Sequence, residues 1–474
     1  MAPYQDLRQF LDVLDQHKQL LHVTEQVALE PDLGAAGCAL AQLGGSSPAI
    51  RFTDIAGYAG ADLVMNVHGS WRNHALALGL DPDTSPRGQF ERFVEGYRRY
   101  PGELERVPQA PWQENAVEDV NLYDLMPLHR LNRGDGGCFI DKPCVVSRDP
   151  DHPGDDDLEN VGVYRLQVKG RNRLGIQTVP QHDIAVHLAH AEARGEDLPV
   201  AIALGNDPVM TLMAATPMLY TQLEYKMAAA MQGAPYRVVS TTAGLDVPWG
   251  SEYVLEGRIL GRQREPEGPF GEFPGYYSGC HRYPVIEIDR VNHRTNPIFD
   301  SVYVGRPWTE IDYLQAMTTS TPIFVQLNES FPEVTAVNAL YTHGLVVIVS
   351  TRVRYGGFAK AVGMALLTTP HGLGYAAIVI VVDHDVDPFD LPQVMWAMSV
   401  KVNPAGDVLI LPNLSVNLLD PAGQPTGMIH KMIIDATTPV APDVRGDYGE
   451  ELDRPQGTDA WHAKLTEMIK ELRG

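Results

Sequence analysis

The run Ala376–Val382, AAIVIVV, indicates the fold class of this 474-residue chain most directly. A continuous apolar run of this length, shortly after Gly374, is typical of a strand buried on both faces of a sheet. The run Leu345–Val349, LVVIV, follows Gly344 and has the same pattern. Val285–Val291, VIEIDRV, instead alternates apolar and polar residues, as a half-buried strand does. Strands are therefore predicted in the middle and late parts of the chain.

Helical patterns accompany these strands. Apolar residues spaced three and four apart predict an amphipathic helix at each end of the chain, with stripes at Leu7, Phe10, Leu11 and Leu14 and at Trp461, Leu465, Met468 and Leu472. We expect these stripes to pack in the core or against another subunit. Further helices are predicted at 183–192 and 219–231. Three Pro and three Gly exclude a helix interior in Glu265–Gly275. The chain is thus predicted to be α+β or mixed α/β.

Composition narrows the function classes. Lys and Arg number 37 and Asp and Glu 60, for a net charge of −23, which argues against a general binder of nucleic acids or anionic membranes. An anionic small molecule would need a locally positive pocket. The four Cys exclude a disulfide scaffold, and no apolar run approaches the roughly 18 residues that span a bilayer. Without a signal-peptide pattern, we expect a soluble cytoplasmic protein.

Local composition marks candidate boundaries. The Pro-rich, charged segment 101–118 is predicted to be a linker, 149–157 (DPDHPGDDD) an acidic loop, and 328–334 a second boundary. Motifs of simple NAD enzymes, P-loop ATPases, zincins and α/β-hydrolases are absent from the sequence. His187 and His190 share one helical face, where we expect a solvated pair rather than a metal site.

Two carboxylates, Glu267 and Glu272, lie five residues apart in the segment EGPFGE. Paired carboxylates on a constrained loop suit acid–base chemistry, because mutual repulsion raises the pKa of one of them. The alternative is a surface loop with two solvated glutamates. Pro269 and the glycines restrict the backbone, and Phe270 and Phe273 supply apolar cover, which favours the first interpretation.

Three further residues, Asn160, His182 and Glu224, offer amide oxygen, imidazole nitrogen and carboxylate, which suit Mn²⁺ or Mg²⁺. They lie far apart, so their types alone do not group them. Arg165 falls in the predicted strand Val161–Val168. It is either an ordinary exposed arginine or the cation that an anionic substrate needs.

At these residues the sequence resembles the UbiD-like decarboxylases that use prenylated FMN, most closely the C subunit of hydroxyarylic acid decarboxylases. The resemblance covers nearly the whole chain. It rests on eight short motifs in order: MNVHGSW from Met65, NVGVYR from Asn160, PQH from Pro180, EGPFGE from Glu267, YTHGL from Tyr341, GGFAKAVG from Gly356, DVDPFDLPQVMWAMS from Asp385 and MIIDATTPVAPDVRG from Met432.

The resemblance implies a role for each candidate residue. Asn160, His182 and Glu224 would hold Mn²⁺ next to the flavin phosphate, with K⁺ nearby. Glu267, Arg165 and Glu272 would form the catalytic network, with Glu272 as proton donor and Arg165 holding the substrate carboxylate. Residues lining the cofactor would be Asn160, Val161, Gly162, Val163, Tyr164, Arg165, Gln181, His182 and Glu224. In the cinnamate-decarboxylating branch, a flavin-contacting lysine corresponds to Gly372 and an arginine near the ion site to Lys401.

One physical difficulty concerns Asn160 and Arg165. Residues five apart in a regular strand point to opposite faces, so the two should not meet one cofactor from the same side. Either the backbone forms a loop or bulge around Gly162, or the two residues contact different parts of a long cofactor. We favour the second explanation.

The implied fold has an N-terminal segment (1–115), a flavin- and metal-binding split β-barrel domain (116–305), a helical connector (306–330) and a C-terminal oligomerisation domain with a terminal helix (331–474). The implied partners are further copies of the chain in a dimer or hexamer, a flavin prenyltransferase as cofactor supplier and a small companion subunit. Nucleic acid and membrane are not expected as partners.

The expected activity is reversible, non-oxidative decarboxylation of a para-hydroxylated aromatic acid, such as vanillate, 4-hydroxybenzoate or protocatechuate, to the phenol and CO₂. A heteroaromatic acid (pyrrole, indole or furan carboxylate) is the alternative substrate. A flavin reductase with plain FMN and a non-catalytic assembly subunit also stay open. The carboxylate pair favours decarboxylation, because hydride transfer needs no such pair. The matched catalytic positions speak against an assembly subunit.

Overall fold

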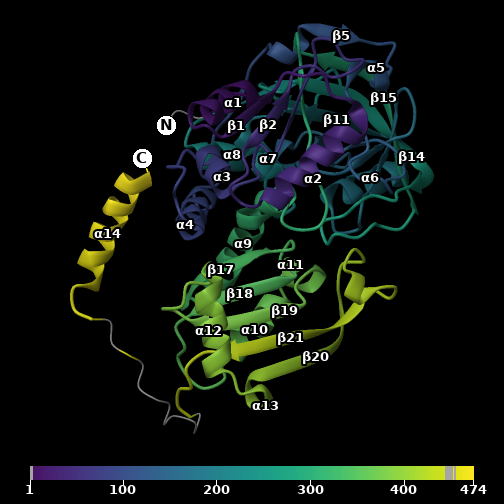
Figure 1. Cartoon of the computed structure of the whole chain (residues 1–474). Coiled ribbons are helices and arrows are strands. Elements are labelled where there is room, and N and C mark those ends of the chain that lie inside the picture. The colour runs from purple at the N-terminus through teal and green to yellow at the C-terminus, as the bar shows by residue number, and fades with distance from the viewer. Residues whose placement is uncertain (1–3, 443–451, 453–454, 474) are drawn as a thin grey trace.

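A computed structural model describes residues 4–442, 452 and 455–473 (Figure 1). It has a larger part that contains the N-terminal and central segments and a smaller C-terminal part, with helix α9 between them. The predicted mixed α/β architecture is confirmed. Residues 443–446, the end of the last motif, lie outside the described residues.

The N-terminal segment packs helices around a small sheet of order β1-β2-β3-β16. Asp6 caps the first helix by accepting from Gln9 N–H at 2.9 Å, and the predicted stripe of that helix is buried, which confirms its place in the core. The elements are α1 (Leu7–Gln16), β1 (Leu20–Val23), α2 (Gly34–Leu43), β2 (Ala49–Phe52), β3 (Asp62–Met65), α3 (Trp71–Ala77), α4 (Pro86–Tyr97) and β16 (Ile298–Asp300).

The central segment is built on a nine-stranded sheet of order β6-β9-β10-β15-β14-β11-β7-β8, with β5 paired to β15. The order ends at β6 and β8, so the sheet is open, as expected of a split barrel. Its strands are β5 (Asn115–Val117), β6 (Phe139–Ile140), β7 (Cys144–Arg148), β8 (Glu159–Val163), β9 (Leu166–Val168), β10 (Arg173–Ile176), β11 (Leu198–Leu204), β14 (Tyr253–Glu267) and β15 (His281–His293).

A smaller sheet of order β13-β12-β4 and four helices complete this segment. They are β4 (Leu104–Arg106), β12 (Tyr236–Ser240), β13 (Asp246–Pro248), α5 (Leu122–Leu125), α6 (Asp183–Arg194), α7 (Pro208–Ala214) and α8 (Glu224–Gln232). The prediction of a linker at 101–118 is wrong, because β4 and β5 pair with strands of the two sheets. The boundaries predicted at 115, 305 and 330 remain predictions.

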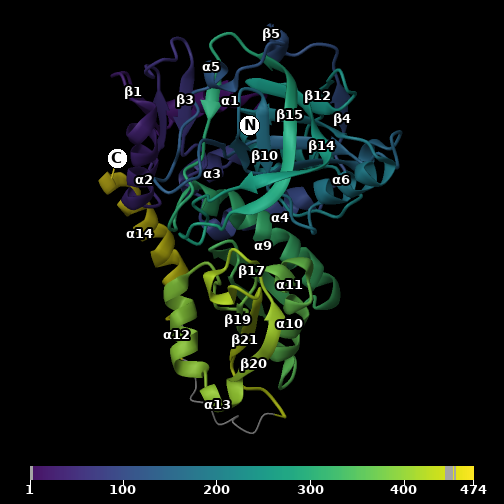
Figure 2. The same ribbon diagram turned by 90° about the vertical axis from the view of Figure 1, so that its right-hand side faces the viewer.

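The C-terminal part alternates strands and helices around a sheet of order β17-β18-β19-β21-β20 (Figure 2). The predicted apolar runs form β18 and β19, which pair in parallel at the middle of this sheet. The elements are α9 (Glu310–Ser330), β17 (Val334–Tyr341), β18 (Val346–Thr351), α10 (Phe358–Leu367), α11 (Pro370–Gly374), β19 (Ile378–Asp383), α12 (Leu391–Lys401), α13 (Pro404–Asp407), β20 (Val408–Ser415), β21 (Met428–Ala436) and α14 (Thr458–Arg473).

The terminal helix α14 stands apart from the body of the molecule in Figure 1. Its predicted apolar stripe is exposed, from 47% at Leu465 to 84% at Leu472, so within one chain it has no place in the core. No helix in the described part of the chain combines the length and apolarity that crossing a bilayer requires.

Candidate active site

The hairpin of β14 and β15 carries the EGPFGE segment at its tip. The ladder ends with the pair Glu267 and His281, and the chain then loops out before it returns. The loop is tied to the residues just before β6, since Gly136 N–H donates to Pro269 O at 2.7 Å and Gly271 N–H to Asp135 Oδ1 at 2.8 Å. Glu267 is fully buried and Glu272 is 8% exposed. The alternative of two solvated glutamates is therefore wrong.

Arg165 lies between these two carboxylates. Its Nε and Nη2 donate to Glu267 at 3.0 and 2.8 Å in a bidentate pair, and its Nη1 donates to Glu272. The guanidinium also lies over the Phe270 ring, 5.2 Å from its centroid, and its Nη2 donates to Ser278 Oγ at 3.4 Å. Arg165 is buried, so the alternative of an ordinary exposed arginine is wrong as well. The structure thus brings together all three residues of the predicted catalytic network.

The strand predicted over Val161–Val168 is interrupted. β8 ends at Val163 and pairs with β7, whereas β9 begins at Leu166 and pairs with β6 and β10. Tyr164 and Arg165 form the connection, so the alternation of strand faces does not relate Asn160 to Arg165. The prediction of one continuous strand is wrong, and with it the objection that the two residues cannot serve one site.

The predicted metal ligands gather around Tyr164. Asn160 Nδ2 lies 3.4 Å from Glu224 Oε1, and Tyr164 donates from its hydroxyl to Asn160 Oδ1 at 3.1 Å. The Tyr164 and His182 rings are 5.1 Å apart, centroid to centroid. His182 is the residue before α6, and Glu224 is the first residue of α8. Asn160 and Glu224 are in direct contact, whereas His182 joins them through the tyrosine ring.

Burial controls the protonation of two of these side chains. Desolvation raises the pKa of Glu224 to about 8 and lowers the pKa of His182 to about 4. The imidazole is therefore neutral at pH 7, as a metal ligand must be. Glu224 accepts from Val161 N–H at 2.9 Å and from the Asn160 amide, both neutral donors.

The helix that begins at Glu224 is shorter than predicted. The sequence pattern indicated a start at Leu219, but Leu219–Gln222 form a turn in which the Gln222 side chain accepts from Leu219 N–H at 3.1 Å. Because local bonds satisfy this backbone, the helix begins five residues later. Glu224 consequently lies in the first turn of a helix and not in its middle.

The remaining predicted cofactor-lining residues lie along β8 and before α6. Val161 and Gly162 are buried, Val163 is half-buried and Gln181 is exposed. A Cβ at Gly162 would lie 2.4 Å from the Tyr164 ring, so this position needs glycine. Sequence reasoning missed Asp135 and Ser278, which hold the EGPFGE loop in place. No pattern in the sequence marks them, because their contacts depend on tertiary folding.

The two departures from the related branch have structural explanations. A Cβ at Gly372 would lie 1.9 Å from Leu366 O, so a lysine there would require the backbone to move. Lys401 is buried and donates to Asp383 Oδ2 at 2.8 Å and to Thr438 Oγ1 at 3.0 Å. Lys401 therefore has an ion-pair partner within the C-terminal part.

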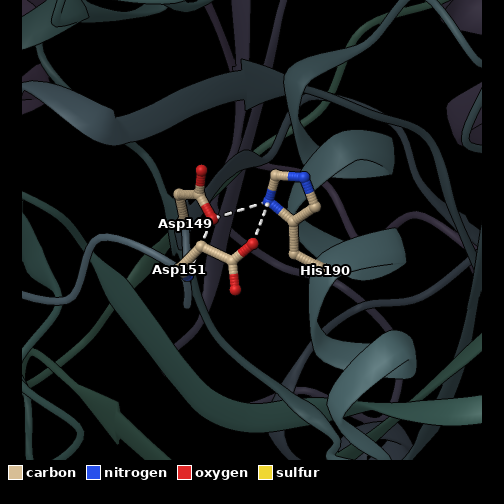
Figure 3. A group of neighbouring side chains, drawn as sticks. All are labelled: Asp149, Asp151 and His190. Carbon is tan, nitrogen blue, oxygen red and sulfur yellow. Dashed lines mark hydrogen bonds and ion pairs between the residues drawn. The ribbon is translucent and has the colours of Figure 1, made fainter.

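A second polar cluster lies where the acidic loop meets α6 (Figure 3). His190 Nδ1 lies 2.8 Å from Asp149 and 3.5 Å from Asp151. Tyr220 donates to Asp149 at 2.6 Å and Arg194 to Asp151 at 2.9 Å, so protein donors already pair both carboxylates. His187 is buried, so the prediction of a solvated histidine pair is wrong for that residue. The cluster anchors the loop to the helix.

Models of known protein families match the N-terminal, central and C-terminal parts of the chain separately. Family models described as 3-octaprenyl-4-hydroxybenzoate carboxy-lyase match the chain over 11–93 (N-terminal domain), 105–307 (Rift-related domain) and 312–436 (C-terminal domain). A phenolic acid decarboxylase of Bacillus subtilis is 56% identical over 471 residues, covering 99% of this chain and 100% of the relative.

Solved structures agree with these matches. Vanillic acid decarboxylase of Sedimentibacter hydroxybenzoicus in its closed form superposes with a TM-score of 0.92 at 52% identity, covering 99% of this chain and 100% of that one. The UbiD-class enzyme HmfF of Pelotomaculum thermopropionicum, solved in complex with FMN, superposes with a TM-score of 0.83 at 29% identity and 96% and 98% coverage. An evolved dimeric form of HmfF was solved with prenylated FMN (TM-score 0.81, 28% identity, 96% and 98% coverage).

Proposed function

The chain belongs to the UbiD family of carboxy-lyases, and from this premise we propose that it decarboxylates a para-hydroxylated aromatic acid reversibly, with prenylated FMN as cofactor. It is an aromatic acid decarboxylase with a flavin cofactor; the substrate subclass and the prenylated form are the parts proposed here. Relatives more than 50% identical are named for phenolic acids and vanillic acid. The observation that carries the proposal is the buried Arg165 held between Glu267 and Glu272.

We propose that Glu267 stays paired with Arg165 during the reaction, whereas Glu272 gives up its hydrogen bond to Arg165 when the substrate binds. The Glu267 pair is bidentate and fully buried, whereas Glu272 uses a single guanidinium nitrogen. A substrate carboxylate would replace Glu272 at Nη1, and bound flavin would supply the electron sink for decarboxylation. After CO₂ leaves, Glu272 would deliver a proton to the ring carbon that carried it. A proton from solvent would then restore the acid.

The donor set around Tyr164 fits Mn²⁺. Asn160 offers an amide oxygen, His182 a neutral imidazole and Glu224 a carboxyl group that would release its proton on binding the ion. His182 immediately precedes α6 and Glu224 is the first residue of α8, and the partial positive charge of these two helix N-termini favours a flavin phosphate beside the ion. Exposed Gln181 would contact the cofactor there, together with Val161, Gly162 and Val163. K⁺ is proposed as a second ion.

Metal analysis tests this ion site. We expect about one Mn per chain in the purified protein, together with K, and a chelator should release both Mn and flavin. Glu224→Gln removes the only carboxylate of the predicted ligand set, so this variant should lose both without unfolding. Glu256→Gln is the matched control, since Glu256 is also buried and accepts from Asn292 Nδ2, at 2.8 Å. Retention of Mn in Glu224→Gln would refute the assignment.

The cofactor and substrate can be tested together. Protein made with a flavin prenyltransferase should carry a flavin with the mass of prenylated FMN and should release CO₂ from 4-hydroxybenzoate, vanillate or protocatechuate. Protein made without that enzyme should be inactive or carry plain FMN. Full activity with FMN alone would refute the cofactor proposal, and activity only on pyrrole, indole or furan carboxylates would replace the substrate class.

Oligomerisation is proposed through the C-terminal part. The exposed stripe of α14 and exposed Trp396 and Met395 on α12 are apolar surfaces that another copy of the chain could cover, in a dimer or hexamer. Light scattering should give the molar mass of a dimer or hexamer. The substitution Leu465→Glu in α14 should lower that mass. A small companion subunit is proposed as a further partner, to be sought by co-expression. The four free cysteines support a reducing, cytoplasmic location.

A further inference from the structure

The residue that follows Glu272 is buried although it lies at the tip of a loop. Phe273 is only 6% exposed. It occupies the second position of a turn in which Gly275 N–H donates to Glu272 O at 2.9 Å, and Glu272 N–H donates to Tyr276 O, also at 2.9 Å. The loop residues before Glu272 are tied to the segment that carries Asp135. The position of Glu272 therefore depends on what holds Phe273 on the other side.

The ring that contacts Phe273 comes from the C-terminal domain. His343, in the turn between β17 and β18, lies 5.3 Å from the Phe273 ring, centroid to centroid, at an interplanar angle of 64°. His343 in turn packs edge-on against Tyr375 at 4.5 Å and His371 at 5.6 Å. His371 and Tyr375 stack on each other at 5.0 Å. α11, which includes His371, lies at the end of the C-terminal part that faces the rest of the molecule (Figure 1).

We propose that His343 is a positioning residue for decarboxylation: by packing against Phe273 it sets the position of Glu272 relative to Arg165. This inference rests on the proposed function of Glu272 as proton donor. The physical reason is that proton transfer requires accurate alignment, and a misplacement of about 1 Å can reduce a rate by about 10²-fold. On one side of Glu272, Gly271 is bonded to Asp135 of the central domain, and on the other side Phe273 packs against His343 of the C-terminal domain. Loss of either contact would let the Glu272 carboxyl group move away from its position beside Arg165.

The chemistry of histidine suits this place. His343 has a φ of +54°, a left-handed conformation that histidine tolerates better than most non-glycine residues. Desolvation lowers the pKa of His343 to about 3, so the ring that meets Phe273 is uncharged at pH 7. The ring cluster is therefore an apolar packing contact rather than a cation–π contact.

The test uses His343→Asn in the full-length holoenzyme, because asparagine also tolerates the left-handed conformation but removes the ring. Phe273→Ala removes the other side of the contact. His384→Asn, at an exposed histidine of the same domain, is the matched control. We expect His343→Asn to lower kcat by about tenfold or more, with KM and the flavin absorbance spectrum within about twofold of wild type. His384→Asn should match wild type.

Two further measurements distinguish positioning from other roles. The double variant should lose no more activity than the more damaging of the two single variants, because both substitutions remove the same contact. Hydrogen exchange at the Glu272 and Gly275 amides should accelerate in His343→Asn and stay unchanged in His384→Asn. Unchanged exchange, additive losses or an effect confined to KM would overturn the proposal. The exchange measurement needs no turnover, so it decides on positioning even if the wild-type protein fails to decarboxylate the proposed substrates.

Discussion

Replacing Glu272 by glutamine tests the central chemical assignment, because the substitution keeps the shape of the side chain and removes its transferable proton. The amide oxygen can still accept from Arg165 Nη1, and the bidentate pair between Arg165 and Glu267 is untouched. The guanidinium should therefore stay in place. We expect flavin content, the flavin spectrum and KM to remain within about threefold of wild type, since general acid loss affects the transition state and not ground-state binding.

The expected loss in kcat follows from the role. Loss of a general acid reduces rates by about 10²–10⁴-fold, or about 2.7–5.4 kcal/mol of barrier. Glu272 is 8% exposed, so water has little access to substitute for it, and the upper half of this range is expected. The assay is CO₂ release at saturating substrate, combined with deuterium uptake from D₂O into the ring of the phenol product. Both should fall together, because exchange is the protonation step run in reverse.

Glu265→Gln is the matched control for this variant. Glu265 lies seven residues earlier on β14, is partly exposed and pairs with Arg173 at 2.9 Å outside the site. Its replacement should change kcat by less than about twofold, as expected for a surface ion pair. If the Glu272 variant still exchanges deuterium at the wild-type rate, Glu272 is not the acid, and Glu267 becomes the candidate.

Three other substitutions have outcomes set by the described contacts. Arg165→Lys keeps the charge but loses the bidentate fork, so CO₂ release should fall by about 10²-fold or more while flavin stays bound. Lys142→Met leaves the buried carboxylates of Asp300 and Glu310, now 2.9 and 2.8 Å from the ammonium, without a cation; denaturation should show a loss of about 3–5 kcal/mol. Burial lowers the pKa of His74 to about 4 from its ordinary 6.5, so the unfolded chain takes up the proton first, and its contribution to stability is complete above pH 6.5 and lost towards pH 4. In His74→Gln the free energy of unfolding should therefore fall less steeply over that range, by up to about 1.4 kcal/mol per pH unit, as measured by denaturation at each pH.

The sequence alone determined those features that depend on local pattern. The stripe of α1 and the apolar runs of β18 and β19 predicted their elements because periodicity and burial are coupled along a helix or strand. The site residues were found through short motifs in a fixed order, which identified the family and the residue types its chemistry needs. The two glycines and the single proline of EGPFGE likewise predicted a constrained loop correctly.

Only the tertiary structure decided which of these residues meet. Arg165 and Glu267 are 102 residues apart, and no local pattern relates them. The break after Val163 also results from tertiary structure, because β8 and β9 pair with different strands. The local sequence pattern on its own predicts one continuous strand. From the sequence, Phe273 was predicted only to give apolar cover to the carboxylates. The tertiary structure shows that it packs against His343 of another domain. Local sequence encodes backbone preference and burial, whereas the contacts that align a proton donor arise where distant segments pack, and their free energy has no signature in a single segment.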